Sequence, residues 1–227
     1  MTRPVLYPLR SVETATVRYT AAPHHRRRVT IDHRPLANVT PDMLLDWFTH
    51  LGGTMSYGSA VIDRYLAWHP IDHIRWELAR PAPGGGAAEG ARFRIVEAFG
   101  GRPEFKVDVV DRVEKLDETG IRLVQRVAGI PILQLEHTWS MGAEGTHYVS
   151  VMDIGARSRL LTPVNRALYK RFPDEMLRAW VKHNIEEVGQ LEYLLPQLES
   201  GEAEPPQGAQ RCDGAPRREH GHPEPVH

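Results

Sequence analysis

The sequence predicts an α+β fold in which a curved antiparallel sheet grips one long C-terminal helix. Between residues 73 and 154, six consecutive segments are rich in Val, Ile, Phe and Tyr and are joined by short turns. Consecutive strands with short links are typical of an antiparallel meander. Near the C-terminus, PDEMLRAWVKHNIEEVGQLEYLLPQL has the apolar spacing of a long amphipathic helix. Two shorter helix patterns precede the strands.

The chain divides into three regions. Residues 1–38 contain two β-leaning stretches, TATVRYT and RRVTIDH, and are expected to form a short N-terminal β arm, which is a candidate contact in a homodimer. Residues 39–199 are expected to form the helix-grip domain. Residues 200–227 are rich in Pro, Gly and Glu and offer little to bury, so a disordered tail is expected.

Two short helices are expected before the strands. Thr40 suits an N-cap and Pro41 the first helical position, so one helix begins here. A second, from about Ser59 to Trp68, should end before Pro70, because the residue before a proline is pushed out of helical geometry.

Composition excludes several classes of protein. With 227 residues, 28 basic and 29 acidic, the chain has room for one domain and carries no strong net charge. We therefore expect neither a nucleic-acid partner nor a membrane partner. The only cysteine, Cys212, cannot form an internal disulfide, and no apolar run approaches the ~18 residues of a membrane span. A soluble cytoplasmic protein is expected.

The long helix places two polar residues in the middle of its apolar stripe. His183 and Glu187 lie at i and i+4, where side chains are about 5–6 Å apart, close enough to bind one metal ion. Burying an unpaired carboxylate costs several kcal/mol, so Glu187 needs a partner. The pair is either half of a zinc site or a buried His–Glu hydrogen bond. The stripe consists of Met176, Trp180, His183, Glu187, Leu191, Leu194 and Leu198.

The segment YLAWHPIDHIRWE offers further ligands. His69 and His73 are four residues apart, but Pro70 prevents them from sharing a helical face, so at most one is expected to bind metal. Strand alternation places His73 on the same side as Arg75 and Glu77, so the pattern alone leaves its direction open.

Several of these motifs resemble one enzyme family. RYLAWHPIDHIRW, GRPEF, LEHTWS and the helix with HNIEE are together similar to the diacetylphloroglucinol hydrolase and phloretin hydrolase family, over most of residues 40–198. The resemblance implies a Bet v1/START-like helix-grip fold and a Zn²⁺ ion held by His73, Glu104, His183 and Glu187. Glu104 is in phase with the solvent side of its strand, so Glu97 on the preceding strand is the alternative ligand.

The resemblance also implies two catalytic residues, Tyr65 near the first ligand and His137 on a late strand. Alternation places His137 on the same side as Leu135 and Trp139, facing the expected cavity, although a core histidine would show the same pattern. Tyr65 is expected to orient a phenol as a hydrogen-bond donor, and His137 to act as general acid or base.

The implied function is zinc-dependent hydrolysis of the carbon–carbon bond between an acyl group and a phenolic ring, with a small aromatic ketone or related diketone as substrate. The alternative is a non-catalytic helix-grip carrier of an apolar or aromatic molecule. A third reading is a zinc enzyme of this architecture that acts on another bond. Metal content separates the carrier from the enzymes.

Overall fold

The computed structural model describes residues 3–200. Its main feature is one antiparallel sheet of eight strands, in the order β1-β2-β10-β9-β8-β7-β6-β5. All six strands predicted between residues 73 and 154 are present. The strands of the sheet are β1 (Ala15–Ala22), β2 (Arg26–His33), β5 (His73–Arg80), β6 (Arg92–Ala98), β7 (Lys106–Asp117), β8 (Gly120–Val127), β9 (Ile130–Gly142) and β10 (Gly145–Ile154).

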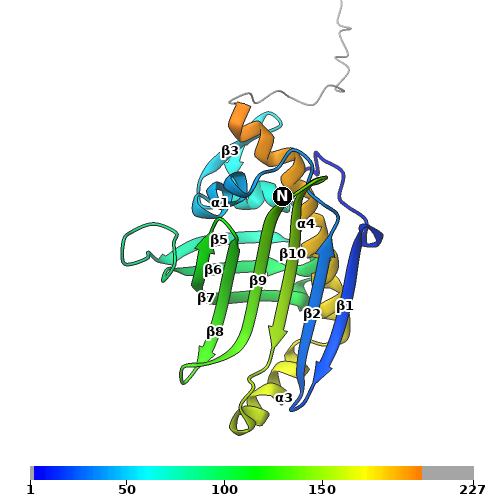
Figure 1. Cartoon of the computed structure of the whole chain (residues 1–227), viewed down its shortest axis with the longest axis vertical. Helices are drawn as coiled ribbons and strands as arrows, with labels where there is room; N and C mark the ends of the chain where they lie inside the picture. Colours follow the sequence, from blue (N-terminus) through cyan, green and yellow to red (C-terminus); the bar gives the residue numbers. More distant parts are fainter. Residues whose placement is uncertain (1–2, 201–227) are drawn as a thin grey trace, which may run out of the picture.

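The longest helix lies against one face of this sheet (Figure 1). The sheet curves around it, so the predicted helix-grip fold is confirmed. The helices of the described residues are α1 (Pro41–Thr49), α2 (Arg64–Trp68), α3 (Thr162–Arg171) and α4 (Asp174–Ser200).

The core between sheet and helix has two apolar clusters. One joins α1, α2 and the second half of α4, and includes Trp47, Trp68 and Leu191. The other joins β2, β10 and the first half of α4, and includes Ile31 and Trp180. Burying so much aromatic and aliphatic surface is the main source of stability in such a domain.

The middle of α4 is buried on nearly all sides. The predicted stripe is buried from Met176 to Leu194, and Glu186, which is not part of the stripe, is also only 5% exposed. The N-terminal segment covers this second face, where Arg10 forms an ion pair with Glu192 at 2.6 Å.

The N-terminal region extends the sheet. Strand β2 pairs with β10, and β1 pairs with β2, so the expected arm is hydrogen-bonded to the body. Most of the expected tail, including Cys212, lies outside the described residues, and the domain boundaries remain a prediction.

The short elements before β5 differ from one expectation. Helix α1 begins as predicted, with the Thr40 hydroxyl accepting from the Met43 amide at 3.2 Å. The helix predicted from Ser59 to Trp68 is wrong in its first half. There, β4 (Ala60–Asp63) pairs with β3 (Thr54–Tyr57) in a hairpin, and only α2 is helical.

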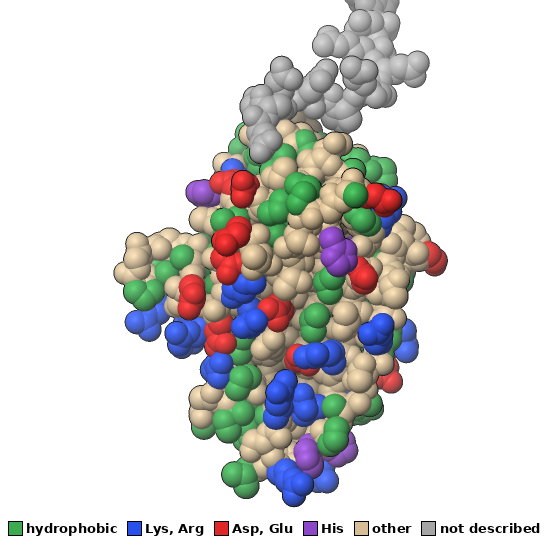
Figure 2. Space-filling view, viewed as in Figure 1, with side chains coloured by type: hydrophobic (Ala, Val, Ile, Leu, Met, Phe, Trp, Pro, Cys, Tyr) green, Lys and Arg blue, Asp and Glu red, His purple; other side chains and the backbone are tan. Residues whose placement is uncertain are grey.

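Side chains of opposite charge form ion pairs on the outer face of the sheet. Ion pairs join neighbouring strands, such as Arg28 with Asp153 and Arg122 with Glu136, both at 2.6 Å. Acidic and basic side chains both occur on this face (Figure 2). Within residues 3–200, no helix has both the length and the apolar character needed to cross a lipid bilayer.

Candidate metal centre

Four side chains lie close together where β5 and β6 meet α4. His73, His183 and Glu187 are buried and spaced for one metal ion, and Glu97 beside them is partly buried. His73 begins β5 and stands opposite Glu97 of β6, and His183 and Glu187 come from α4. The Nε2 atom of His73 lies 3.4 Å from Glu97 Oε1 and 3.4 Å from Glu187 Oε2. The Nε2 atom of His183 lies 3.6 Å from Glu187 Oε2 and 3.8 Å from Glu97 Oε2.

These distances suit a metal site. Donor atoms around a tetrahedral zinc ion, with bonds of about 2.0–2.2 Å, lie roughly 3.3–3.6 Å from one another. The four side chains are between 0% and 13% exposed. Two imidazoles and two carboxylates are ligands that zinc accepts, and their charges balance a divalent cation.

Glu104 does not belong to this group. It lies in a 3₁₀ turn, Pro103–Phe105, where its exposed carboxylate accepts a hydrogen bond from Arg102 at 2.8 Å. The buried Phe105 takes the inward position instead. The prediction of Glu104 as a ligand is therefore wrong for this geometry, whereas the alternative, Glu97, lies beside His73.

A hydrogen bond at Nδ1 of each imidazole fixes the orientation of the His73 and His183 rings. His73 Nδ1 lies 2.6 Å from the Tyr65 carbonyl oxygen, and His183 Nδ1 lies 3.0 Å from Asp72 Oδ2. Each Nε2 therefore faces the carboxylates, as is typical of metal-bound histidines. The Nε2 atom of His73 is buried and has no hydrogen-bond partner, so it fits a missing metal bond.

Asp72 supports the centre and was missed in the sequence. Its carboxylate accepts from the amides of Gly100 and Gly101, each at 2.8 Å, besides contacting His183. Both glycines have positive φ, 69° and 67°, which turns their amides toward Asp72. Burial alone would raise the pKa of Asp72, but the hydrogen bond and charge of His183 lower it.

The protein alone leaves the centre electrostatically unbalanced. Burial, with a contribution from Glu97, raises the pKa of Glu187 to about 8, although His183 opposes the shift. Burial opposes protonation of His183, yet Glu187 and Asp72 raise its pKa to about 9. Both shifts follow from packing these groups together out of contact with water.

A further buried layer lies behind the centre. His69 Nε2 is 3.4 Å from Glu186 Oε2, and Lys182 pairs with the same carboxylate. His69, Asp72 and His183 could also hold a metal by proximity. Because Asp72 and His183 are hydrogen-bonded to each other through the relevant atoms, we assign these residues a supporting role.

Tyr65, a catalytic residue by the resemblance, lies beside His73 and Glu97. Its hydroxyl donates to Glu97, and its ring stacks on His73 with centroids 3.9 Å apart. Burial, reinforced by Glu97, raises the pKa of Tyr65 well above 10, so the phenol stays protonated.

His137 reaches the same cavity from β9. Burial, and then the charge of His183, lower its pKa to about 3, so the ring is neutral near pH 7. The cavity has a volume of about 50 Å³. It is lined by Phe48, Leu51, Tyr65, Trp68, Phe93, Ile95, Glu97, Ile121, Leu123, Leu135, His137, Trp180, His183 and Glu187.

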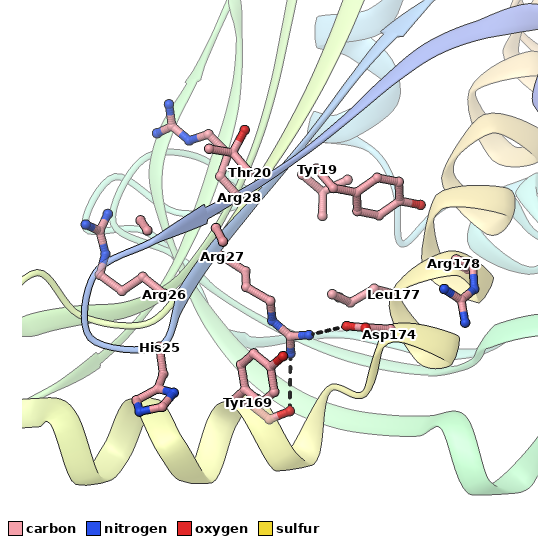
Figure 3. Close-up of a pocket in the computed structure, with 13 residues that line it drawn as sticks. Tyr19, Thr20, His25, Arg26, Arg27, Arg28, Tyr169, Asp174, Leu177 and Arg178 are labelled. Atoms are coloured by element: carbon pink, nitrogen blue, oxygen red, sulfur yellow. Dashed lines mark hydrogen bonds and ion pairs between the residues drawn. The ribbon is translucent and has the colours of Figure 1, made fainter.

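A larger pocket, of about 580 Å³, lies elsewhere on the molecule. It is bounded by the β1–β2 hairpin, α3 and the start of α4. Arg27 forms an ion pair with Asp174 there at 2.9 Å, and Tyr19 is among the lining residues (Figure 3). It contains none of the predicted site residues, so its size does not bear on the centre.

Comparisons with known proteins give only distant similarities. No protein-family model matches the chain, and no curated protein does. Similar solved structures include protein NE0264 from Nitrosomonas europaea, with 16% identity, 79% of this chain and 99% of that chain covered, and a TM-score of 0.44. A START superfamily protein from Mycobacterium smegmatis has 11% identity and a TM-score of 0.38, and the match covers 72% of this chain and 98% of that chain. Ara h 8.0201 has 11% identity, covers 75% of this chain with 98% of its own chain, and has a TM-score of 0.37. At these values the similarities carry no information on function.

Proposed function

We propose that the protein is a zinc-dependent hydrolase that cleaves the carbon–carbon bond between an acyl group and a phenolic ring. The observation that carries the proposal is the convergence of two imidazole nitrogens and two carboxylates at donor spacings of 3.4–3.8 Å. His73, Glu97, His183 and Glu187 would hold the ion. The sequence resemblance supplies the reaction and the class of substrate.

Each side chain then has a distinct task. When bound, zinc supplies a Lewis acid for a ketone oxygen and a source of hydroxide near neutral pH. The phenol oxygen of Tyr65, whose own proton is held by Glu97, can accept a hydrogen bond from a phenolic hydroxyl of the substrate. This differs from the donor role expected for Tyr65 from the sequence.

His137 is suited to proton transfer. Hydrolysis adds hydroxide to the acyl carbon, breaks the bond to the ring, and leaves the electron pair on the ring carbon, which must take a proton. A neutral imidazole at the cavity wall can accept the proton of water and return it to the ring. The products are a carboxylic acid and the deacylated phenol.

Substrate binding requires side chains to move. The cavity of about 50 Å³ is too small for an acylphenol, since water occupies about 30 Å³ and small-molecule sites usually span roughly 300–1,000 Å³. The aromatic lining, including Phe48 and Trp68, is the part of the wall that must rearrange.

A carrier of apolar molecules fits the centre less well. Such a protein gains nothing from two carboxylates buried beside its cavity, and their desolvation would weaken its fold. Glu97 and Glu187 have side chains only 13% and 6% exposed. A carrier remains the alternative. Bound zinc in the purified protein would argue against it, and folded protein that binds no zinc would support it.

The test is incubation of zinc-loaded protein with a panel of acylphenols and β-diketones, with detection of the released carboxylic acid. We expect release from at least one hydroxylated aryl ketone, and a decrease of about 10²-fold or more for His137→Gln. Glu104→Gln should match the wild type. If zinc is bound and no ketone is cleaved, the substrate class is wrong, and another reaction of the zinc centre is favoured.

A further inference from the structure

The pocket between the β1–β2 hairpin, α3 and the start of α4 lies apart from the metal centre and shares no lining residue with the central cavity. Its volume of about 580 Å³ is within the range of roughly 300–1,000 Å³ that is typical of small-molecule sites. The central cavity, at about 50 Å³, is far smaller. A molecule with one or two rings is therefore small enough for the larger pocket.

Aromatic and aliphatic side chains supply the apolar part of the pocket wall. The rings of Tyr19 on β1 and Tyr169 on α3 line the pocket and are 52% and 43% exposed. Tyr19 extends from the hairpin toward α4, and Leu177 extends from α4 toward the hairpin (Figure 3). The Arg27 guanidinium lies 4.1 Å from the centre of the Tyr169 ring. The exposed ring of Tyr19 and the side chain of Leu177 are the surfaces that the ring of a ligand would cover.

The pocket carries an excess of positive charge. Asp174 is the one acidic residue among the described residues that line it, and Arg27 pairs with that carboxylate at 2.9 Å. Arg178, four residues further along α4, is exposed. A helical arginine pairs with acidic residues three or four positions away, but Asp174 and Glu175 are already bound by Arg27 and Arg102. The positive charge of Arg178 is thus left for an anion from solution.

The turn of the hairpin is fixed against α3. His24 and His25 have positive φ, 65° and 60°, which is uncommon for residues other than glycine. The fully buried Asn165 of α3 donates to the His24 carbonyl oxygen at 2.8 Å and accepts from the Ala156 amide at 2.7 Å. The His25 ring meets the edge of the Tyr169 ring, with centroids 6.1 Å apart. These contacts form the wall before any ligand binds, which reduces the cost of ordering on binding.

We propose that this pocket binds a small organic anion, an aromatic carboxylate, with its ring against Tyr19 and Leu177 and its carboxylate at Arg178. The planar guanidinium group can bind a carboxylate through two parallel hydrogen bonds. The apolar wall covers the ring and favours an aromatic carboxylate over an inorganic anion. The site does not depend on the proposed hydrolase activity, because none of its lining residues belongs to the metal centre.

Three probes with the same ring system test the class of ligand: 2-naphthoate, its neutral amide 2-naphthamide, and the cation 2-naphthylmethylamine. Calorimetric titration of the full-length protein measures each affinity. We expect 2-naphthoate to bind about fivefold or more tightly than the amide, and the cation to bind most weakly. Equal affinity for the anion and the amide, or no binding of 2-naphthoate tighter than about 1 mM, overturns the proposal.

Variants locate the bound anion. Arg178→Gln should lower the affinity for 2-naphthoate to that of the amide, and Tyr19→Ser should weaken both probes. Arg18→Gln is the matched control, because Arg18 is an exposed neighbour of Tyr19 on β1 but does not line the pocket. If Arg178→Gln binds 2-naphthoate as the wild type does, the anion binds elsewhere, the metal centre included, and the proposal is wrong. No turnover is measured, so this outcome is independent of the hydrolase test.

Discussion

Each proposed ligand forms a supporting hydrogen bond with a group that the sequence pattern does not reveal. His183 depends on Asp72, and Asp72 depends on the amides of Gly100 and Gly101. Such supporting hydrogen bonds set the ring orientation and usually change metal affinity by 10–100-fold when lost. The centre is therefore defined by more residues than bind the ion.

The choice between Glu97 and Glu104 gives a sharp prediction. Glu97→Gln should weaken zinc binding by about 100-fold or more, because it removes one of two negative charges facing the ion. Glu104→Gln should bind zinc as the wild type does, because the Glu104 carboxylate lies on the surface and pairs with Arg102. Competition with a chelator measures both, and equal effects of the two substitutions would refute the assignment.

At this scale, the sequence placed His73, His183 and Glu187 among the candidate ligands, and the structure brings these three together. Spacing by resemblance favoured Glu104, which the structure places in an exposed turn, and the alternative, Glu97, lies beside His73. The geometry of that turn could not be predicted from alternation, because side-chain direction follows the pleat only within a strand.

At the scale of elements, capping and strand patterns were predictive, but the hairpin of β3 and β4 was not. Tyr57 pairs with Ala60 across Gly58 and Ser59, and Gly58 has φ of 61°. A glycine followed by serine between two β-prone runs is a hairpin signal, and here it prevails over the helix expected from Ser59. Tertiary pairing, rather than helix propensity, decides this segment.

The start of β8 makes a prediction about stability. At Gly120, φ is 152° and an added Cβ would lie 2.2 Å from the His137 carbonyl oxygen. Gly120→Ala should therefore lower the free energy of unfolding by about 3 kcal/mol or more, because backbone must move. Gly129→Ala is the control, since it has φ of 78° but open space around it, and should cost only about 1–2 kcal/mol. Chemical denaturation of both variants measures the difference, and equal costs would contradict the close approach.

At the scale of the molecule, the fold places a cluster of ionisable side chains inside a small domain, and stability should depend on metal and pH together. Burial opposes protonation of His183, but Glu187 and Asp72 raise its folded-state pKa from 6.5 to about 9. The folded, metal-free protein thus holds a proton that the unfolded chain releases above 6.5, so its stability falls between pH 6.5 and 9. The raised pKa of Glu187 acts in the same direction.

Zinc should remove this loss, since the ion replaces the proton between the ligands. Melting temperatures of metal-free and zinc-loaded protein, compared at pH 6.5 and 9, test this. We expect the gap between the two forms to widen as pH rises. A constant gap would show that the proton is not held by the ligands.

The overall architecture was the part most predictable from sequence, because six strand patterns in a row followed by a long amphipathic helix leave few compact arrangements. The incorporation of the N-terminal strands was less predictable, because β2 joins β10 across more than a hundred residues of chain. The small cavity volume also escaped prediction, because it depends on how aromatic side chains from distant segments fill one space.

The most direct test of the zinc centre is the metal content of purified protein. After equilibration with zinc and removal of excess ion, elemental analysis should find about one zinc per wild-type chain. Glu187→Ala, which removes a ligand from the middle of α4, should retain almost none while keeping its helical and strand content. A folded wild-type protein that binds no zinc would contradict the hydrolase proposal and favour the carrier.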